Sequence, residues 1–429
     1  MKKLLSLCAI CLLMPLSLTA EDTKTIRKIT VQDAAELAAS NNISLKRQKL
    51  SLTGLEIKDK YSWNGISPSI SLSGGYTGNI PYSEGQDYTQ SWSISGSVNL
   101  TFTPALYTSI KNARLSFENG QITYDTLVRT TDLNVRKAFY SLLYSKENLA
   151  LKERNLETAR KNYVSNRDRY NRGQLSELNL LNSQYAYESQ KPALESAQIA
   201  YENDISTFKQ MLGIPQDTEI ELSGSLEEYE NIGDIIVEKQ IEDLPDVQKL
   251  LKQIEISENN LLASKFSAWG PSLSAGYSYG GRINGGNYQT SGNSLSVNVR
   301  IPLDGFLPWS NGALSIETQK AALEDLQLQL ENQKITSELA IQNTLKKIKQ
   351  AKSQLNTLKT NISLAQRKYN ATLTAYNHGG ADYLTLQNAS DALLSANLSR
   401  QAQLLTLIST ILDLENMLGV PFGTLGFAK

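Results

Sequence analysis

The sequence predicts a mostly helical chain that also carries two pairs of membrane-type β-strands, all within one structural unit that occurs twice. Three observations indicate this fold class. First, the chain of 429 residues matches itself at an offset of 206 residues, from about 135–215 onto 341–421. Second, apolar or tyrosyl residues recur at every seventh position within both copies. Third, segments that precede these helices alternate apolar and small polar residues instead.

The first twenty residues have the features of a secretory signal peptide. In residues 1–20 two lysines precede an apolar stretch that is too short to span a bilayer as a helix, and small residues come before the polar EDTK. Cys8 and Cys11 both lie in this stretch, so cleavage near Ala20 leaves a chain without thiols. Attachment of a lipid to Cys11 is the alternative. Later in the chain no run of 18 apolar residues occurs, so strands would have to make any membrane crossing.

Composition argues against nucleic-acid binding and against catalysis. With 42 Lys and Arg against 43 Asp and Glu, the net charge is −1, which offers no field to attract nucleic acid. His378 is the only histidine, and the sequence contains no HExxH motif and no phosphate-binding loop. Glu227 and Glu228 lie in a polar stretch and are interpreted as a solvated surface. We therefore predict no catalytic residue, no metal site and no cofactor.

Each copy is expected to contain one very long helix, over 105–171 and 312–378. At about 1.5 Å per residue such a helix is on the order of 100 Å long. A heptad repeat kept through six positions in both copies favours gently supercoiled helices. The heptad residues are Val135, Leu142, Leu149, Leu156, Tyr163 and Tyr170 in the first copy, and Ile341, Ile348, Leu355, Ile362, Tyr369 and Tyr376 in the second.

A second, antiparallel helix is expected to follow each long one, over 174–213 and 381–418. The turns between them carry YNRG and YNHG, whose glycines can take a left-handed conformation. The return helices stop at LGIP and LGVP, a glycine-then-proline end in both copies. Pro192 lies inside the first return helix and is expected to kink or break it.

These elements divide the chain into two repeats with a short connection. The first structural repeat occupies 21–215 and the second 245–421. Residues 216–244 form a linker between them, and 422–429 form a C-terminal tail.

Four strands are predicted, at about 68–78, 90–103, 271–281 and 292–303. Their length suits a transmembrane β-strand, which needs about 9–11 tilted residues. In 91–102 the apolar residues take every even position, while Ser, Thr and Asn take the odd ones. The residues expected to face lipid are Trp92, Ile94, Val98, Leu100, Phe102, Leu295, Val297, Val299 and Ile301.

A soluble antiparallel sheet with one face in a core would alternate in the same way. Export, and a polar face of Ser, Thr and Asn rather than Lys and Glu, favour the membrane alternative. Four strands cannot close on themselves, and a sheet without free edges in lipid must be closed. Several chains would therefore have to contribute to one barrel.

The chain resembles the TolC family of outer-membrane efflux ducts. The resemblance rests on the order, repeated twice, of a PSxS strand, an alternating strand, a long helix, a YNxG turn and a return helix that ends in LG[IV]P. The opening helix ITVQDAAELAASNNISLK, residues 29–46, is similar to the one that begins that family's first repeat. The likeness covers essentially the whole chain beyond the signal peptide.

This resemblance implies a homotrimer in the cell outer membrane that extends into the periplasm. Each chain would give four strands to a shared twelve-stranded barrel embedded in outer-membrane lipid, and its long helices to a periplasmic α-barrel. Residues 216–244 would form an equatorial region. The implied function is a passive duct of a tripartite efflux or secretion system, which exports small molecules such as drugs and toxic compounds from an inner-membrane pump through a periplasmic adaptor. Drug efflux, metal efflux and protein secretion all use ducts of this shape, and the sequence does not select among them. The adaptor would dock on the helix tips, which are here Arg172, Gly173, Gln174, Leu175, His378, Gly379, Gly380 and Ala381.

The resemblance also implies a gate at the tip of the second repeat. The family's gating tyrosine falls on Tyr376, and its partner aspartate falls on Asn179. The gate arginine falls on Ala381, and the two aspartates that ring the constriction fall on Thr385 and Asn388. Asp382 lies one helical turn before Thr385 and could ring the entrance instead. Closure would then rest on packing of Tyr376, amide hydrogen bonds and Asp382.

A different class of protein remains open from the residues themselves. A periplasmic coiled-coil scaffold or adaptor could carry the same helices, with its strands in a soluble sandwich and no pore. The two alternatives differ in the surroundings of the even-numbered residues of 92–102, which a channel exposes to lipid and an adaptor buries against protein.

Overall fold

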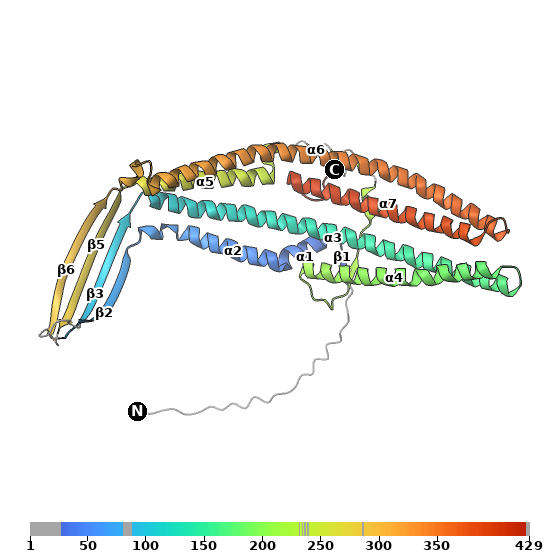
Figure 1. Ribbon diagram of the computed structural model, residues 1–429, viewed down its shortest axis with the longest axis horizontal. Helices are drawn as coiled ribbons and strands as arrows, with labels where there is room; N and C mark the ends of the chain where they lie inside the picture. Colours follow the sequence, from blue (N-terminus) through green and yellow to red (C-terminus); the bar gives the residue numbers. More distant parts are fainter. Residues whose placement is uncertain are drawn as a thin grey trace, which may run out of the picture.

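The computed structural model forms an elongated body, with a sheet at one end and long helices running from it to the other end (Figure 1). The residues it describes are 27–79, 88–230, 232–233, 235, 237, 240–284 and 287–425. The predicted signal peptide, residues 1–20, and the last part of the predicted tail lie outside them. Among the described residues, no helix has both the length and the apolar character that a membrane span requires.

The elements of the first repeat are β1 (Arg27–Ile29), α1 (Val31–Asn41), α2 (Ile43–Lys60), η1 (Ser62–Ile66), β2 (Ser69–Asn79), β3 (Thr89–Phe102), α3 (Ala105–Asn171) and α4 (Glu177–Leu212). The linker contains β4 (Ile220–Leu222), η2 (Leu226–Tyr229) and η3 (Ile241–Asp243). The second repeat contains α5 (Pro245–Trp269), β5 (Ser272–Asn284), β6 (Asn287–Arg300), η4 (Asp304–Phe306), α6 (Asn311–Asn377) and α7 (Tyr383–Leu418).

The long helices α3 and α6 both contain 67 residues, and the return helices α4 and α7 both contain 36. Their ends repeat at the offset found in the sequence, since Ala105 corresponds to Asn311 and Glu177 to Tyr383. All four helices end in a Schellman motif, in which a left-handed residue lets two N–H groups reach back into the last turn. Those residues are Gly173, Gly213, Gly379 and Gly419.

The return helices begin slightly later than their predicted starts at 174 and 381, because side chains cap them further along. Ser176 accepts a hydrogen bond from the N–H of Asn179 at the start of α4, and Asp382 accepts one from the N–H of Thr385 at the start of α7. The break expected at Pro192 does not occur, since α4 is one helix from end to end. Pro192 is solvent-exposed, so water can reach the carbonyl that its ring leaves without a donor.

The four long strands form one antiparallel sheet in the order β2-β3-β5-β6. The helices that adjoin the sheet lie in the same order, because α2 packs on α3, α3 on α5, and α5 on α6 (Figure 1). The strands β2, β3 and β5 start and end within three residues of their predicted bounds. Strand β6 starts at Asn287 rather than 292, because pairing with β5 continues past an irregularity at Gly280 and Gly281.

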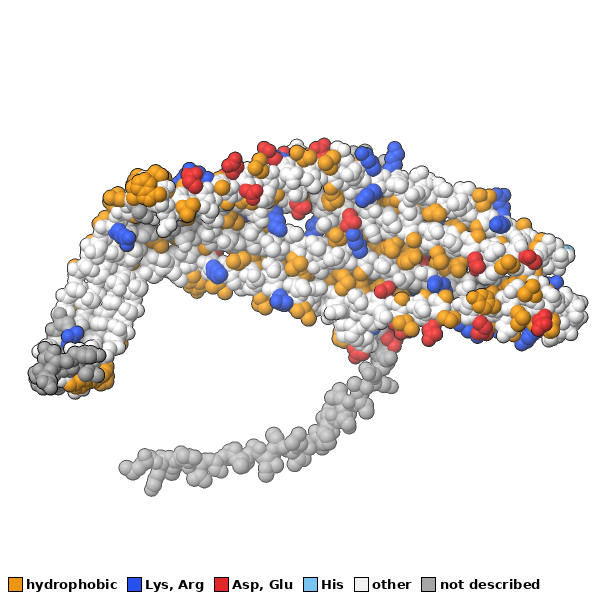
Figure 2. All heavy atoms as spheres, viewed as in Figure 1, with side chains coloured by type: hydrophobic (Ala, Val, Ile, Leu, Met, Phe, Trp, Pro, Cys, Tyr) orange, Lys and Arg blue, Asp and Glu red, His pale blue; other side chains and the backbone are white. Residues whose placement is uncertain are grey.

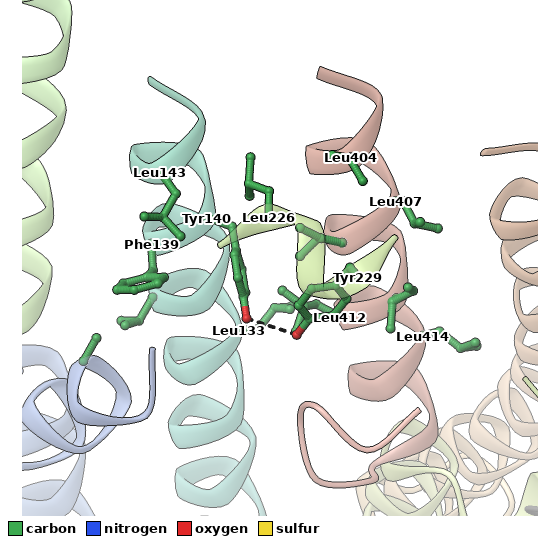
Figure 3. Close-up of a cluster of buried hydrophobic side chains, with 14 of the residues drawn as sticks. Leu133, Phe139, Tyr140, Leu143, Leu226, Tyr229, Leu404, Leu407, Leu412 and Leu414 are labelled. Atoms are coloured by element: carbon green, nitrogen blue, oxygen red, sulfur yellow. Dashed lines mark hydrogen bonds between the residues drawn. The ribbon is translucent and has the colours of Figure 1, made fainter. Parts of the chain in front are cut away.

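The main hydrophobic core lies midway along the helices, where the linker crosses them. This cluster includes Leu133, Phe139 and Leu143 of α3 and Leu404, Leu407 and Leu412 of α7 (Figure 3). Leu226 and Tyr229 of the linker fill the space between the two helices, and the hydroxyls of Tyr140 and Tyr229 lie 3.0 Å apart. The linker is thus part of the core rather than a loop around it.

Ion pairs hold the polar side of the linker on the second repeat. Arg400 of α7 contacts Glu230 at 3.0 Å and Glu227 at 3.2 Å, while Lys359 of α6 contacts Glu230 at 3.2 Å. Glu227 was interpreted from the sequence as part of a solvated surface; it is exposed, but it also forms an ion pair with Arg400. Glu228, its neighbour, is exposed.

Candidate gate and channel surfaces

Both helix turns lie at the end of the molecule opposite to the sheet (Figure 1). The predicted tip residues are there, between α3 and α4 and between α6 and α7. Leu175 and Ala381 are half-buried, and the other members of the two tips are solvent-exposed. Each tip is held by hydrogen bonds of its own backbone, such as Gln174 N–H to the carbonyl of Arg169 at 2.8 Å. Each turn is therefore closed by its own backbone hydrogen bonds, and the side chains of Arg172, Gln174 and His378 are solvent-exposed.

Tyr376 lies in a small buried cluster close to the tips. It is only 6% exposed, and it packs with Ala186 of α4 and with Tyr383 and Leu386 of α7. The rings of Tyr376 and Tyr383 meet edge to face, with centroids 6.0 Å apart. The guanidinium of Arg169 on α3 lies 5.3 Å from the centroid of the Tyr376 ring. Three helices besides its own thus surround this side chain.

The hydroxyl of Tyr376 donates a hydrogen bond to Oδ1 of Asn166 on α3, at 2.5 Å. Asn166 is 1% exposed, and its Nδ2 has no hydrogen-bond partner among the described residues. Burial raises the pKa of Tyr376, against the opposing effects of Arg169 and Asn166. Burial also raises the pKa of Tyr383, to about 12. Both phenols are therefore neutral at physiological pH.

Sequence reasoning did not find Asn166. It lies three residues after the heptad residue Tyr163, on the same side of the helix, and a polar residue there is a signal that a buried partner is needed. The partner could not be named from the sequence, because it comes from the other repeat.

The other predicted gate residues line the first turns of the return helices. Asn179 is half-buried, whereas Asp382, Thr385 and Asn388 are exposed. Hydrogen bonds from Thr385 hold the pKa of Asp382 below its ordinary value, so this carboxylate stays charged at neutral pH. Among the described residues, no hydrogen bond joins any of these four side chains to Tyr376, whose hydroxyl bonds to Asn166.

One face of the sheet is apolar across all four strands. The register places Ile70, Val98, Tyr277 and Leu295 in one row, and Tyr76, Trp92, Ile283 and Tyr288 in another. Of the residues predicted to face lipid, Leu100 is half-buried and the others are exposed, with Leu295 at 77%. Ile301 lies just past the end of β6. The chain itself therefore leaves this apolar surface uncovered.

The opposite face is polar and consists mostly of small hydroxyl side chains. The hydroxyls of Ser71 and Ser97, of Ser73 and Ser95, and of Ser278 and Ser294 lie within 2.8 Å of each other across neighbouring strands. Figure 2 shows the sheet almost entirely white, with orange hydrophobic side chains gathered where it meets the helices. Trp269, Phe306 and Trp309 are exposed at that junction.

The sheet has two free edges, β2 and β6, within the described chain. The helices that continue these edges carry exposed apolar side chains at heptad spacing. On α2 these are Ile43, Leu50 and Ile57, and on α6 they are Leu314, Leu328 and Ile335, with Leu339 one helical turn further on. Free strand edges and apolar stripes therefore occur together on both sides of the molecule.

Comparison with known proteins identifies the architecture. The family model described as "Outer membrane efflux protein" matches residues 35–214 and 242–420, two ranges that overlap the two predicted repeats. No curated protein sequence matches the chain.

In the described part of the chain, no group of three or more His, Cys, Asp or Glu side chains is placed to hold a metal ion.

Solved outer-membrane channels share the fold. The Campylobacter jejuni outer membrane channel CmeC is 16% identical, with a TM-score of 0.74 over 91% of this chain and 85% of its own. The open-state Neisseria gonorrhoeae outer membrane channel MtrE is 17% identical, with a TM-score of 0.73 over 91% and 89%. The Vibrio cholerae outer membrane protein VceC is 13% identical, with a TM-score of 0.72 over 91% and 96%. The predicted fold class and the TolC-like resemblance are confirmed, and the chain belongs to the outer membrane efflux protein family.

Proposed function

We propose that this chain is one subunit of a homotrimeric, passive channel in the outer membrane, which forms the exit duct of a tripartite exporter of small molecules such as drugs and toxic compounds. The observation that carries this proposal is the coincidence of free strand edges with exposed apolar stripes on both sides of one chain. A second copy of the chain, placed beside the first, would pair a free strand edge and cover an apolar stripe at the same time.

The strand directions are compatible with ring closure. The four strands alternate in direction, so β6 of one copy and β2 of the next run antiparallel when the sheets are joined side by side. Pairing them removes the unpaired N–H and C=O groups that lipid would leave unsatisfied. Three copies would supply the twelve strands that the TolC-like resemblance implies.

The arrangement that joins the sheets also brings helices of neighbouring copies into contact. Because α2 continues the β2 edge and α6 the β6 edge, joining the sheets brings α2 of one copy beside α6 of the next. Ile43 and Leu50 are more than 70% exposed in the single chain, and a neighbouring helix would bury them. Each apolar side chain fully buried contributes about 1.5–3 kcal/mol.

The gate would be the Tyr376 cluster together with the first turns of α4 and α7. Its hydrogen bond joins α6 to α3, and hence the second helix pair to the first, close to the helix tips. Holding the pairs together there would keep the entrance closed, and separating them would open it. In a trimer Asn179, Asp382, Thr385 and Asn388 would then lie around the entrance.

The tips would be the docking surface of a periplasmic adaptor that links the channel to an inner-membrane pump. Three observations support this role: the tips are solvent-exposed, their turns are closed by backbone hydrogen bonds, and they lie far from the sheet, which stands in the membrane in this arrangement. Export to this site would use residues 1–20 as the signal peptide.

Membrane fractionation followed by single-channel recording tests the proposal. The protein should stay with the outer membrane until detergent is added, and the purified protein should give steady conductance steps in a planar bilayer. Release into the periplasmic fraction without detergent, with no conductance, would instead indicate the soluble scaffold.

A further inference from the structure

We infer that the interior of the barrel favours anionic solutes, through two arginines per chain on the polar face of the sheet, Arg282 and Arg300. This inference rests on the proposed function, because the polar face becomes a lumen only when the sheets close with their apolar face outward. It concerns which solutes the duct passes, and it involves residues distant from the gate.

Both arginines belong to the polar face by register. Arg282 of β5 pairs with Ser93 of β3 and Gln289 of β6, and it alternates with the small residues of that face. Arg300 ends β6 and pairs with Ser272 of β5. Both are solvent-exposed, and within the described residues neither guanidinium forms an ion pair with a carboxylate.

Acidic side chains do not offset these charges within the sheet. The described strands β2, β3, β5 and β6 contain no Asp, Glu or Lys, and their polar positions are Ser, Thr, Asn, Gln and Gly. The serine hydroxyls between the arginines bond to each other in cross-strand pairs. The charge of this face is therefore positive.

The two arginines mark different levels of the barrel. Arg282 lies near the β5–β6 hairpin, and Arg300 lies where the sheet joins the helices. In a trimer each level would carry three guanidinium groups. A ring of like charges sets the charge preference of a pore, and guanidinium binds carboxylate and phosphate groups with two parallel hydrogen bonds. Solutes that carry such groups would be drawn into the barrel.

The charge at the periplasmic entrance, beside the helix tips, is expected to be negative rather than positive. Asp382 is exposed at the second tip and its pKa is lowered by hydrogen bonds from Thr385, so a trimer would carry acidic charge there. Charge at the tips and charge in the barrel are separated by the long helices, far beyond the Debye length of about 10 Å at 0.1 M salt. They can therefore be removed and measured independently.

The test is the reversal potential of purified channels in planar bilayers under a potassium chloride gradient. Replacing both arginines in the Arg282→Gln, Arg300→Gln variant should lower the chloride-to-potassium permeability ratio by about twofold or more, as expected for screened charges at pore distances. The charge-conserving Arg282→Lys, Arg300→Lys variant should keep the ratio of the original channel. Asp382→Asn, which preserves the helix cap, should move the ratio in the opposite direction.

The two proposals fail in different ways. If no variant, nor the original protein, forms conducting trimers, the proposed function is wrong. If the Arg→Gln variant forms trimers of normal conductance with an unchanged permeability ratio, the channel stands and the anion preference is overturned.

Discussion

The hydroxyl of Tyr376 on α6 donates to Oδ1 of Asn166 on α3 at 2.5 Å, so one buried hydrogen bond joins the two repeats beside the helix tips. Tyr170 occupies the corresponding position of the first repeat and is exposed. The two repeats are alike in sequence and in helix length, but only the second contributes its tyrosine to a buried contact. The two repeats therefore differ at the position of the proposed gate.

Removing this hydrogen bond should favour the open channel. Tyr376→Phe keeps the ring packing and loses only the hydroxyl, and a net hydrogen bond is worth about 1 kcal/mol, or about fivefold in an equilibrium constant. Asn166→Ala should act in the same direction, and the double variant should add little to either single change, because both remove one contact. Open probability in single-channel recordings measures the effect.

Tyr369→Phe is the matched control for the gate prediction. Tyr369 lies two turns earlier on α6, is half-buried, and packs against the same cluster. No hydrogen bond from its hydroxyl occurs within the described residues, so its loss should leave the open probability unchanged. An equal effect of Tyr369→Phe and Tyr376→Phe would mean that packing rather than the hydrogen bond holds the gate.

The cap of α7 should control the order of its first turn. Asp382→Ala removes the acceptor of the Thr385 N–H at 2.7 Å, and should lower hydrogen-exchange protection at the start of α7 several-fold. Asp382→Asn should retain most of the protection, since Asn also caps helices. Unchanged exchange in the alanine variant would show that water or a neighbouring chain satisfies that N–H.

The linker should lose its attachment at low pH. Burial acts to raise the pKa of Glu230, but Arg400 and Lys359 overcome this effect and hold the pKa below its ordinary value. The ion pairs therefore stabilise the folded chain fully above the ordinary pKa, and this stability is lost as pH falls through the lowered one. Thermal unfolding of the original protein and Glu230→Gln, followed by circular dichroism, should differ at neutral pH and converge in acid.

At neutral pH, Glu230→Gln should cost about 1–2 kcal/mol, as expected for partly buried, charge-assisted hydrogen bonds. Glu228→Gln serves as the control, because Glu228 is exposed two residues away and should contribute little. A difference between the original protein and Glu230→Gln that persists at low pH would contradict the assignment of the effect to these ion pairs.

Periodicity in the sequence was sufficient to predict the elements. The heptad and the 206-residue offset predict two long helices, and α3 and α6 have that relation. Alternation in 91–102 predicts which residues share a face of the sheet, and the register of β3 with β2 and β5 agrees. Periodic patterns report which side of an element is apolar, and helix and strand geometry convert that directly into structure.

Contacts between elements distant in the sequence could not be predicted in the same way. Residue 166 lies three residues after the heptad residue Tyr163 and therefore on the same side of α3, but the heptad does not say that Tyr376 lies opposite. Burial of Tyr229 against Tyr140 was likewise not predicted, because the linker has no periodicity. Pro192 was expected to be more disruptive than it is, since its exposure is a property of the packed helix.

Disulfide crosslinking between β2 and β6 tests the central claim most directly. The only cysteines in the sequence are Cys8 and Cys11, which cleavage of the signal peptide would remove. Any disulfide that forms would therefore involve the introduced cysteines. Neighbouring strands lie about 4.8 Å apart, within the reach of a disulfide. Ser71→Cys on β2 is combined in one chain with a cysteine at Ser294, Ser296 or Asn298 on β6, and Ser71→Cys with Ser97→Cys provides the intrachain control. We predict that at least one β2–β6 pair yields a covalent ladder that stops at three chains. If the control pair oxidises while every β2–β6 pair leaves monomers, three chains do not share one barrel.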